Sequence, residues 1–236
     1  MGGLREIGIS YEKLYDEHAR APFGSAVPYA HLLIDDLFDN QDLDTIRKEF
    51  PPEADPVWRL NHHSHSRKQA LADSSLMGPV SQAYFAAVAS PAFVAVLERV
   101  TGIPDLVPDS QLVGGGYHLS LPGGYLDIHA DFPCHPDLPL TRRLNLITYI
   151  GRDWEKGDGG VFEMWAKDGN EALRRVEPAF NRSLIFSVSP DVYHGHPEPL
   201  RRHRRPSLAV FYYTRDTSMK ERPAQPATDY LAERQA

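Results

Sequence analysis

Two histidines, an aspartate and an arginine occur in three short segments whose residue types suit one kind of chemistry. The segments are His129-Ala130-Asp131, Tyr193-His194-Gly195-His196 and Arg205-Pro206-Ser207. Two imidazoles and one carboxylate form the ligand set that leaves three positions of a non-haem Fe(II) ion open for oxygen chemistry. The planar guanidinium of an arginine matches a carboxylate with two parallel hydrogen bonds. The three segments together predict an iron site beside an arginine that binds the carboxylate of a second molecule.

The spacing of His129 and Asp131 fits an extended segment. Residues two apart on a strand point to the same side, so both side chains are expected to face one metal ion. An isolated pair of this kind is more often structural, and the prediction therefore depends on a third ligand from the distant segment. We assign His194, because the two prolines at 197 and 199 indicate that the strand ends near His196. His196 is then expected at the rim, as a substrate contact.

Alternation along the strand after residue 204 separates Arg205 from its basic neighbours in 201–204. One face of this strand carries Arg205, Ser207, Ala209 and Phe211. Its first two side chains are polar, and the next one is small. The opposite face is apolar and is expected to pack against another layer; its residues are Leu208, Val210 and Tyr212. Arg205 and Ser207 are thus predicted to line a pocket, whereas a salt bridge at a strand edge is the alternative.

Composition places these segments in an ordinary globular protein. The chain has 236 residues, 42% hydrophobic and 24% charged, with a net charge of -7 that argues against a nucleic-acid surface. Its start lacks the pattern of a secretory signal, no apolar run reaches membrane-spanning length, and Cys134 is the only cysteine, so no intrachain disulfide is possible. We expect a cytoplasmic protein with no membrane or nucleic-acid partner.

The surrounding pattern predicts a single domain over 1–236, with a helical support region at about 1–110, a β-rich core at about 111–216 and a C-terminal tail at 217–236. A strand is predicted over 29–37, a helix capped by Asp39 or Asn40 that ends before Pro51, and a second helix that ends at Gly102. Short β-prone runs separated by turn residues predict strands near 112–120, 124–129, 142–150, 160–165, 182–188 and 207–214.

The stretch from about Leu112 to Thr214 resembles the Fe(II)/2-oxoglutarate-dependent oxygenases of the prolyl 4-hydroxylase-like superfamily. Besides the three segments above, the resemblance rests on the glycine pairs Gly123-Gly124 and Gly159-Gly160 and on the strand-like run over 143–150. It implies a mainly β fold with flanking helices, namely a double-stranded β-helix of the jelly-roll or cupin-like kind. It also implies Fe(II), 2-oxoglutarate and O2 as cofactor and cosubstrates.

Carried over to this sequence, the resemblance implies that His129, Asp131 and His194 are the catalytic metal ligands. Arg205 and Ser207 correspond to the pair that binds the distal carboxylate of 2-oxoglutarate. Relatives often have a tyrosine on the strand matching 143–150 as a further contact, where this chain has Thr148. Tyr149 or Asn145 is a possible substitute, so all three remain candidates for cosubstrate binding.

An aromatic and basic cluster precedes the β-rich core, and in this superfamily such segments often line the substrate entrance. A solvated loop is the alternative interpretation. Together with Arg143 and His196, the cluster supplies the candidate substrate-binding residues Trp58, His62, His63 and Arg67, with Asn61, His65 and Lys68 as neighbours. Its charge favours an anionic or zwitterionic substrate.

The predicted activity is that of an oxidoreductase, a 2-oxoglutarate-dependent dioxygenase that hydroxylates an unactivated C–H bond and releases succinate and CO2. The main prediction is a small polar metabolite, such as an amino acid or biosynthetic intermediate, as the substrate. The alternatives are a protein or peptidyl hydroxylase of the prolyl type, a non-catalytic cupin-like binding module, and a zinc hydrolase. Neither of the last two has a use for both the metal ligands and the arginine.

Overall fold

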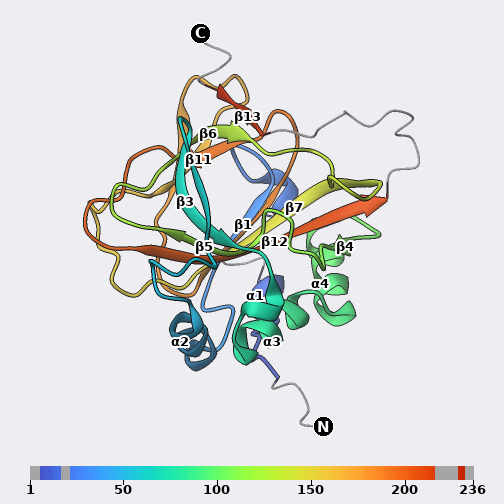
Figure 1. Ribbon diagram of the computed structural model, residues 1–236. Helices are drawn as coiled ribbons and strands as arrows, with labels where there is room; N and C mark the ends of the chain where they lie inside the picture. The colour runs from blue at the N-terminus through green and yellow to red at the C-terminus, as the bar shows by residue number, and fades with distance from the viewer. Residues whose placement is uncertain (1–5, 17–21, 216–227, 232–236) are drawn as a thin grey trace.

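A single curled antiparallel sheet forms the body of the molecule and folds over on itself to enclose the predicted site. The computed structural model describes residues 6–16, 22–215 and 228–231. Ten strands follow one another in the order β1-β10-β7-β12-β5-β3-β6-β11-β8-β9, while β2 pairs with β3, β4 with β12 and β13 with β6. In Figure 1 the helices gather on one side of this sheet, and β6, β11 and β13 lie at the opposite end. This is the mainly β jelly-roll fold that the sequence predicted.

The strands are short except for two that cross the middle of the sheet. Their bounds are β1 His31–Asp35, β2 Arg59–His63, β3 Ser66–Leu71, β4 Val107–Pro108, β5 Gly116–Ser120, β6 Leu126–Ala130, β7 Leu140–Tyr149, β8 Phe162–Trp165, β9 Ala172–Val176, β10 Arg182–Ser187, β11 Tyr193–His196, β12 Arg205–Arg215 and β13 Asp229–Tyr230. The helices are α1 Glu12–Tyr15, α2 Asn40–Glu49, α3 Pro79–Val88 and α4 Pro91–Thr101, with short 3-10 turns at Phe23–Ser25 and Ser74–Leu76.

Two of the helices begin and end where their sequences indicate. Asp39 caps α2, since its Oδ1 accepts hydrogen bonds from the backbone N–H groups of Gln41 and Asp42. Gly102 follows α4 with a φ of 71°, the left-handed conformation that glycine adopts easily at a helix end. These local signals confirm two of the three elements predicted before residue 110, and β1 confirms the third.

The helices cover the outer face of the β10-β7-β12-β5 layer and bury the apolar side of β12. Leu208, Val210 and Tyr212 are at most 1% exposed and belong to the same core cluster as the buried residues of α2, α3 and α4. The hydroxyl of Tyr212 donates a hydrogen bond to the carbonyl of Val88 at the end of α3. The alternation predicted for β12 is therefore confirmed, and it leaves Arg205 and Ser207 on the inner face.

The structure corrects the description of the first 110 residues as a helical support. All four strands before residue 110, β1 to β4, belong to the sheet, and the β2-β3 hairpin closes the curl where β3 pairs with both β5 and β6. Most of the predicted tail 217–236 lies outside the described residues, but 228–231 are described and include β13. Within the described ranges no single helix is long and apolar enough to span a membrane, and only α3 and α4 together, bent by 47°, reach that length and composition.

Candidate metal centre and adjoining pocket

The two predicted histidine ligands lie directly opposite each other on neighbouring antiparallel strands. His129 on β6 pairs in register with His194 on β11, and their ring centroids are 4.5 Å apart. Asp131 follows the last residue of β6, so that it stands two positions beyond His129 on the same side. The sheet thus brings His194 beside His129 and Asp131, which lie far from it in the sequence, as the sequence analysis predicted.

The three side chains converge on one point that a metal ion would fit. One ligand atom from each of His129, Asp131 and His194 lies within 4.8 Å of the other two, and within the described part of the chain these three form the cluster suited to a metal. Nε2 of His129 is 3.6 Å from Oδ1 of Asp131, and Nε2 of His194 is 3.4 Å from Oδ2. Both imidazoles are buried, at 4% exposure each.

Backbone carbonyls fix the orientation of both imidazoles. Nδ1 of His129 lies 2.8 Å from the carbonyl oxygen of Asp127, and Nδ1 of His194 lies 3.3 Å from that of Val192. Because a carbonyl only accepts, Nδ1 carries the proton in each ring and Nε2 keeps its lone pair for a metal. Burial lowers the pKa of His194 despite the opposing attraction of Asp131, which favours the neutral form that binds metals.

Asp131 is held as an anion by a group of donors. Asn145 Nδ2 donates to Oδ2 of Asp131 at 2.7 Å, and a terminal nitrogen of Arg142 lies 3.1 Å from the same oxygen. Burial raises the pKa of Asp131, but Arg142 and the two histidines outweigh it and hold that pKa well below its usual range. The carboxylate is therefore available as a charged ligand at neutral pH.

Arg142 is itself fixed on several sides. Its Nε donates to Oδ1 of Asn145 at 2.8 Å, and its guanidinium carbon lies 3.4 Å from the ring centroid of Phe211 and 4.5 Å from that of Phe132. Stacking on aromatic rings suits a weakly hydrated guanidinium in a buried site. The sequence analysis noted Asn145 only as a cosubstrate candidate, whereas the structure places it as a support for the metal ligand.

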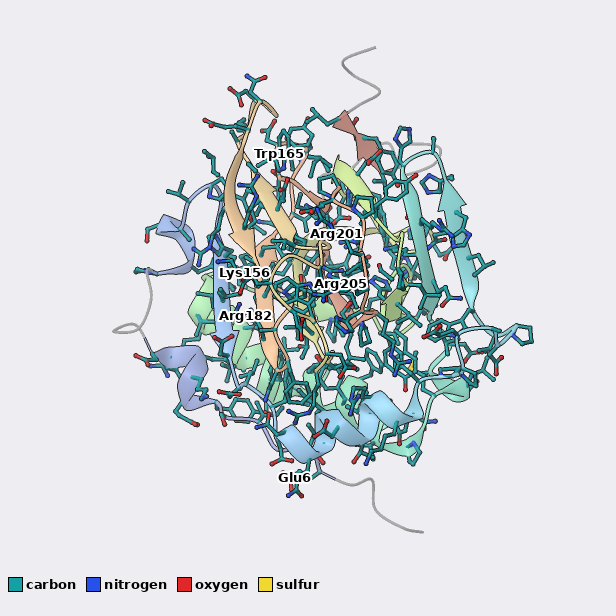
Figure 2. All side chains as sticks on the ribbon, turned by 90° about the vertical axis from the view of Figure 1, so that its left-hand side faces the viewer. Glu6, Lys156, Trp165, Arg182, Arg201 and Arg205 are labelled. Carbon is teal, nitrogen blue, oxygen red and sulfur yellow. The ribbon has the colours of Figure 1, made fainter. Side chains whose placement is uncertain are left out.

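Arg205 lies on the inner face of β12, beside Tyr149 of β7. A terminal nitrogen of Arg205 donates to the hydroxyl of Tyr149 at 3.1 Å, and Ser207 pairs in register with Tyr149 on one side and His118 on the other. The Nε of Arg205 is buried without a hydrogen-bond partner in the described structure. In Figure 2 the labelled Arg205 lies near the middle of the view, among the strands.

Thr148 does not belong to this group. Its hydroxyl accepts a hydrogen bond of 2.9 Å from Tyr84 in α3 and lies 3.0 Å from the hydroxyl of Ser183, so it faces the helices. Successive residues of a strand point to opposite sides, and the inner position therefore falls to Tyr149. The orientation of Thr148 contradicts the prediction that it binds cosubstrate, and Tyr149, which contacts Arg205, remains a candidate for that role.

A pocket of about 390 Å³ joins the metal ligands to Arg205. All four inner-face residues of β12 line it, as alternation predicted. The lining comprises Arg59, Asn61, His63, Ser66, Lys68, Val113, Gly114, His118, Ser120, Leu126, His129, Asp131, Phe132, Pro136, Arg142, Asn145, Ile147, Phe162, His194, His196, Arg205, Ser207, Ala209, Phe211, Thr228 and Tyr230.

Two of the candidate substrate-binding residues reach this pocket. His63 lies on the pocket side of β2, and His196 is 3% exposed in the lining, beyond an irregularity in the pairing of β11 with β6. Because pleating alternates the sides, Asn61 joins His63, while His62 between them is exposed and outside the lining. Burial, with Arg205 and Lys68 nearby, lowers the pKa of His196 well below its usual value.

Three other candidates lie elsewhere, which corrects the prediction for each. Trp58 is 5% exposed in the hydrophobic core, where it packs against Phe50 and donates from Nε1 to the carbonyl of Pro52. Arg67 is exposed on β3, between Ser66 and Lys68, which face the pocket. Arg143 is exposed on β7 and does not line the pocket.

Several pocket residues had no role in the sequence analysis. Lys68 was noted only as a neighbour of the basic cluster, and burial, with Arg205 and Arg142 nearby and Asp131 opposing, lowers its pKa to about 8. Nε2 of His118 donates to the carbonyl oxygen of Gly114 at 2.9 Å, and burial lowers the pKa of His118 well below the usual value. Tyr230 stacks on His65 with centroids 4.5 Å apart. Polar residues at alternate positions of a strand, as in His118 and Ser120, are the signal that could have found one side of this wall.

The donor set fits a ferrous ion with a bound dicarboxylate. Two neutral imidazoles and one carboxylate leave coordination positions open, and the buried Nε of Arg205 is a donor in want of an acceptor. His129, Asp131 and His194 would hold Fe(II), while Arg205, Tyr149 and Ser207 would hold the distal carboxylate of the cosubstrate. Fold and site together fit a non-haem iron centre.

Comparison with known proteins shows which family part of the chain resembles. Residues 116–213, which span β5 to β12, match the model of the 2OG-Fe(II) oxygenase superfamily. This part of the chain is similar to that superfamily, whose members use Fe(II), 2-oxoglutarate and O2. The resemblance seen in the sequence is confirmed.

Individual relatives are similar over different extents. The chain is 32% identical over 71 residues to prolyl 3-hydroxylase OGFOD1 of Xenopus laevis, which is 28% of this chain and 14% of that protein. It thus spans a small part of that relative's length. A prolyl 4-hydroxylase from Pseudomonas putida superposes with a TM-score of 0.60 at 18% identity, covering 87% of this chain and 99% of that one. A prolyl hydroxylase from Trichoplax adhaerens, solved with a peptide fragment of hypoxia inducible factor, has a TM-score of 0.55 at 12% identity and covers 86% and 88%.

Proposed function

We propose that this protein hydroxylates a prolyl residue within a peptide or protein. The observation that carries the proposal is the His129, Asp131 and His194 site beside Arg205, within a segment that matches the 2OG-Fe(II) oxygenase superfamily. The substrate class is supported by the relatives, since the curated match and the two structures described above are prolyl hydroxylases. A small polar metabolite, the main prediction from the sequence, is not confirmed, and its alternative fits these relatives better.

The shape of the entrance also favours an extended substrate. Strand β2 pairs with β3 alone, so its other edge has no strand beside it in the described part of the chain. Arg59, Asn61 and His63 of this strand belong to the pocket lining, and two of the three are exposed. An extended peptide can lie along such an edge and place one side chain in the pocket.

With Fe(II) and 2-oxoglutarate bound, the site would supply oxidation of a C–H bond to an alcohol by O2, coupled to conversion of 2-oxoglutarate into succinate and CO2. The residues of the chain supply position and charge. Arg205 and Tyr149 orient the distal carboxylate of the cosubstrate, while Asn145 and Arg142 keep Asp131 ionised. Phe162 and Phe186 pack against the ring of His194 and keep water from that side.

The proposal is tested by incubating the full chain with Fe(II), 2-oxoglutarate, O2 and a library of proline-containing peptides. We expect a gain of one oxygen atom on a subset of peptides, with an equal amount of succinate, and loss of both in His129→Ala. Amino-acid analysis of the products distinguishes 3-hydroxyproline from 4-hydroxyproline. Succinate release stimulated by small metabolites, with no oxygen on any peptide, would show that the substrate class is wrong.

The absorption band that forms when 2-oxoglutarate chelates Fe(II) without O2 tests the metal site independently of substrate. We expect the band in the wild-type protein and its loss in His194→Ala. A metal-bound protein that forms no such band would instead favour the zinc-hydrolase or binding-module alternatives.

A further inference from the structure

Lys68 presents a cationic group to the pocket that neither the metal nor the cosubstrate needs. It lies on β3, half-buried in the pocket wall, and no carboxylate in the described structure lies within ion-pair distance of its ammonium group. Burial lowers the pKa of Lys68; the attraction of Asp131 opposes this lowering, and Arg205 and Arg142 add to it. A half-buried ammonium group without a counterion is unfavourable unless a ligand supplies one.

Arg59 adds a second cation on the same wall. On the β2-β3 hairpin Asn61 pairs with Lys68 and Arg59 pairs with Ala70, so Arg59 is the diagonal neighbour of Lys68. It is exposed at the entrance, lines the pocket, and forms no ion pair within the described residues. Of the two cations, Arg59 is thus the more exposed and Lys68 the more deeply placed in the pocket wall.

The pocket lining has more cationic than anionic side chains, which favours the binding of a further anion. Four cations, Arg59, Lys68, Arg142 and Arg205, face the pocket against the single carboxylate of Asp131. The two positive charges of Fe(II) and the two negative charges of 2-oxoglutarate cancel, so that binding both leaves the lining with its excess of cations. Arg142 is paired with Asp131 and Arg205 is assigned to the cosubstrate. Lys68 and Arg59 remain to attract a further negative group.

We propose that Lys68, assisted by Arg59, binds the carboxylate of an aspartate or glutamate beside the hydroxylated residue of the peptide substrate. This inference rests on the proposed function, because it assumes a peptide. Binding is strongest for Lys68, whose ammonium group is more shielded from water than the guanidinium of Arg59. An acidic residue at this position also sets the register of the peptide along β2 and so selects which proline enters the pocket.

The experiment uses matched pairs of peptides, with glutamate or glutamine next to the target proline. Affinities are measured by fluorescence anisotropy on the full chain with Fe(II) and 2-oxoglutarate under argon, and rates of hydroxylation under air. We expect the wild-type protein to bind the glutamate peptide ~10-fold tighter or more, as for a charge-assisted hydrogen bond. Lys68→Gln is expected to abolish the difference, with an unchanged KM for 2-oxoglutarate, and Lys68→Glu to favour a lysine peptide instead.

Lys156→Gln serves as the control, because Lys156 is an exposed lysine in a loop and does not line the pocket. Thermal unfolding of each variant verifies that it is folded. A wild-type protein that hydroxylates both peptides equally well overturns the inference and leaves the proposed function standing. A raised KM for 2-oxoglutarate in Lys68→Gln, with the peptide preference intact, overturns it in favour of a cosubstrate contact. Absence of hydroxylation on any peptide overturns the proposed function, and with it this inference.

Discussion

Asn145 links Asp131 to Arg142 with both ends of its amide. Its Nδ2 donates to Oδ2 of Asp131 at 2.7 Å, and its Oδ1 accepts from Nε of Arg142 at 2.8 Å. The amide therefore fixes the plane of the carboxylate and the position of the cation that keeps it ionised. Groups that hold a metal ligand in place commonly affect the affinity for metal almost as much as the ligand does.

Replacing Asn145 with alanine should weaken metal binding. Because Asp131 loses a donor and Arg142 loses an acceptor, we expect the affinity for Fe(II) to fall by ~10- to 100-fold, measured by anaerobic titration of the metal-free full chain. Asn170→Ala, an exposed asparagine in a turn, is the control and should bind as the wild type does. Equal affinities in the two variants would mean that Asn145 does not position the ligand.

Substitutions at the adjacent β7 residues Tyr149 and Thr148 should affect different properties, the first the KM for 2-oxoglutarate and the second the stability of the fold. Tyr149→Phe removes the hydroxyl that accepts from Arg205, and we expect the KM for 2-oxoglutarate to rise ~10-fold, since this hydrogen bond orients a charged group. Thr148→Val removes a hydroxyl that faces Tyr84 and Ser183, so it should lower the free energy of unfolding by about 1–3 kcal/mol and leave that KM unchanged. Steady-state kinetics and urea unfolding separate the two. A shifted KM in Thr148→Val would contradict the assignment of faces.

Neighbouring histidines of β2 offer a similar contrast. His63 lines the pocket, whereas His62 is exposed on the other face. We expect His63→Ala to raise the KM of a hydroxylated peptide about fivefold, corresponding to ~1 kcal/mol, and His62→Ala to leave it unchanged. Arg67→Ala should resemble His62→Ala, because Arg67 also points away. A larger effect from His62 than from His63 would show that the hairpin contacts substrate through its outer face.

Asp158 should make stability depend on acid. Its buried carboxylate accepts from Nε of Arg202 at 2.9 Å and from the backbone N–H of Glu155 at 3.1 Å, and it contacts His203. Burial raises the pKa of Asp158, but these donors outweigh it and lower the pKa to about 2. The native pKa is thus below the ordinary value of ~3.9, so the stabilisation is complete above ~4 and is lost as the pH falls towards 2.

Asp158→Asn should accordingly be less stable than the wild type at pH 7, by a margin that shrinks between pH 4 and pH 2. Urea unfolding at several pH values measures this margin. Asp153→Asn, an exposed residue of the same loop, should show no such trend. A margin that is constant with pH would mean that the carboxylate charge does not contribute.

The sequence allowed the prediction of those parts of the site that depend on strand alternation. His129 with Asp131, and Arg205 with Ser207, are each two residues apart on a strand, so their common orientation follows from local geometry alone. The links from Asp131 to Asn145 and Arg142 could not be predicted, because they depend on where β7 passes the end of β6. The spacing of residues along the sequence does not determine contacts between distant strands.

The least predictable region was the β2-β3 hairpin. Its strands are rich in histidine, arginine and lysine rather than the β-branched and aromatic residues typical of strands, so a loop was an equally good interpretation. Pairing with β5 and β6 stabilises them instead. Trp58 was grouped with this cluster by proximity in the sequence, although its large apolar ring is buried in the core. The buried helix α3 was missed because apolar residues surround it on most sides, which removes the periodic signal.

The irregular pairing between β11 and β6 requires a residue without a Cβ atom at position 195. Gly195 lies between the two histidines of β11, where a methyl group would stand 2.7 Å from the carbonyl oxygen of Leu126 and 2.8 Å from that of Asp127. Both obstacles are backbone and cannot rotate aside. Any larger residue would push β11 away from the strand that carries His129 and separate the paired imidazoles. The width of the metal site is therefore set by the smallest side chain beside it, one that never touches the metal.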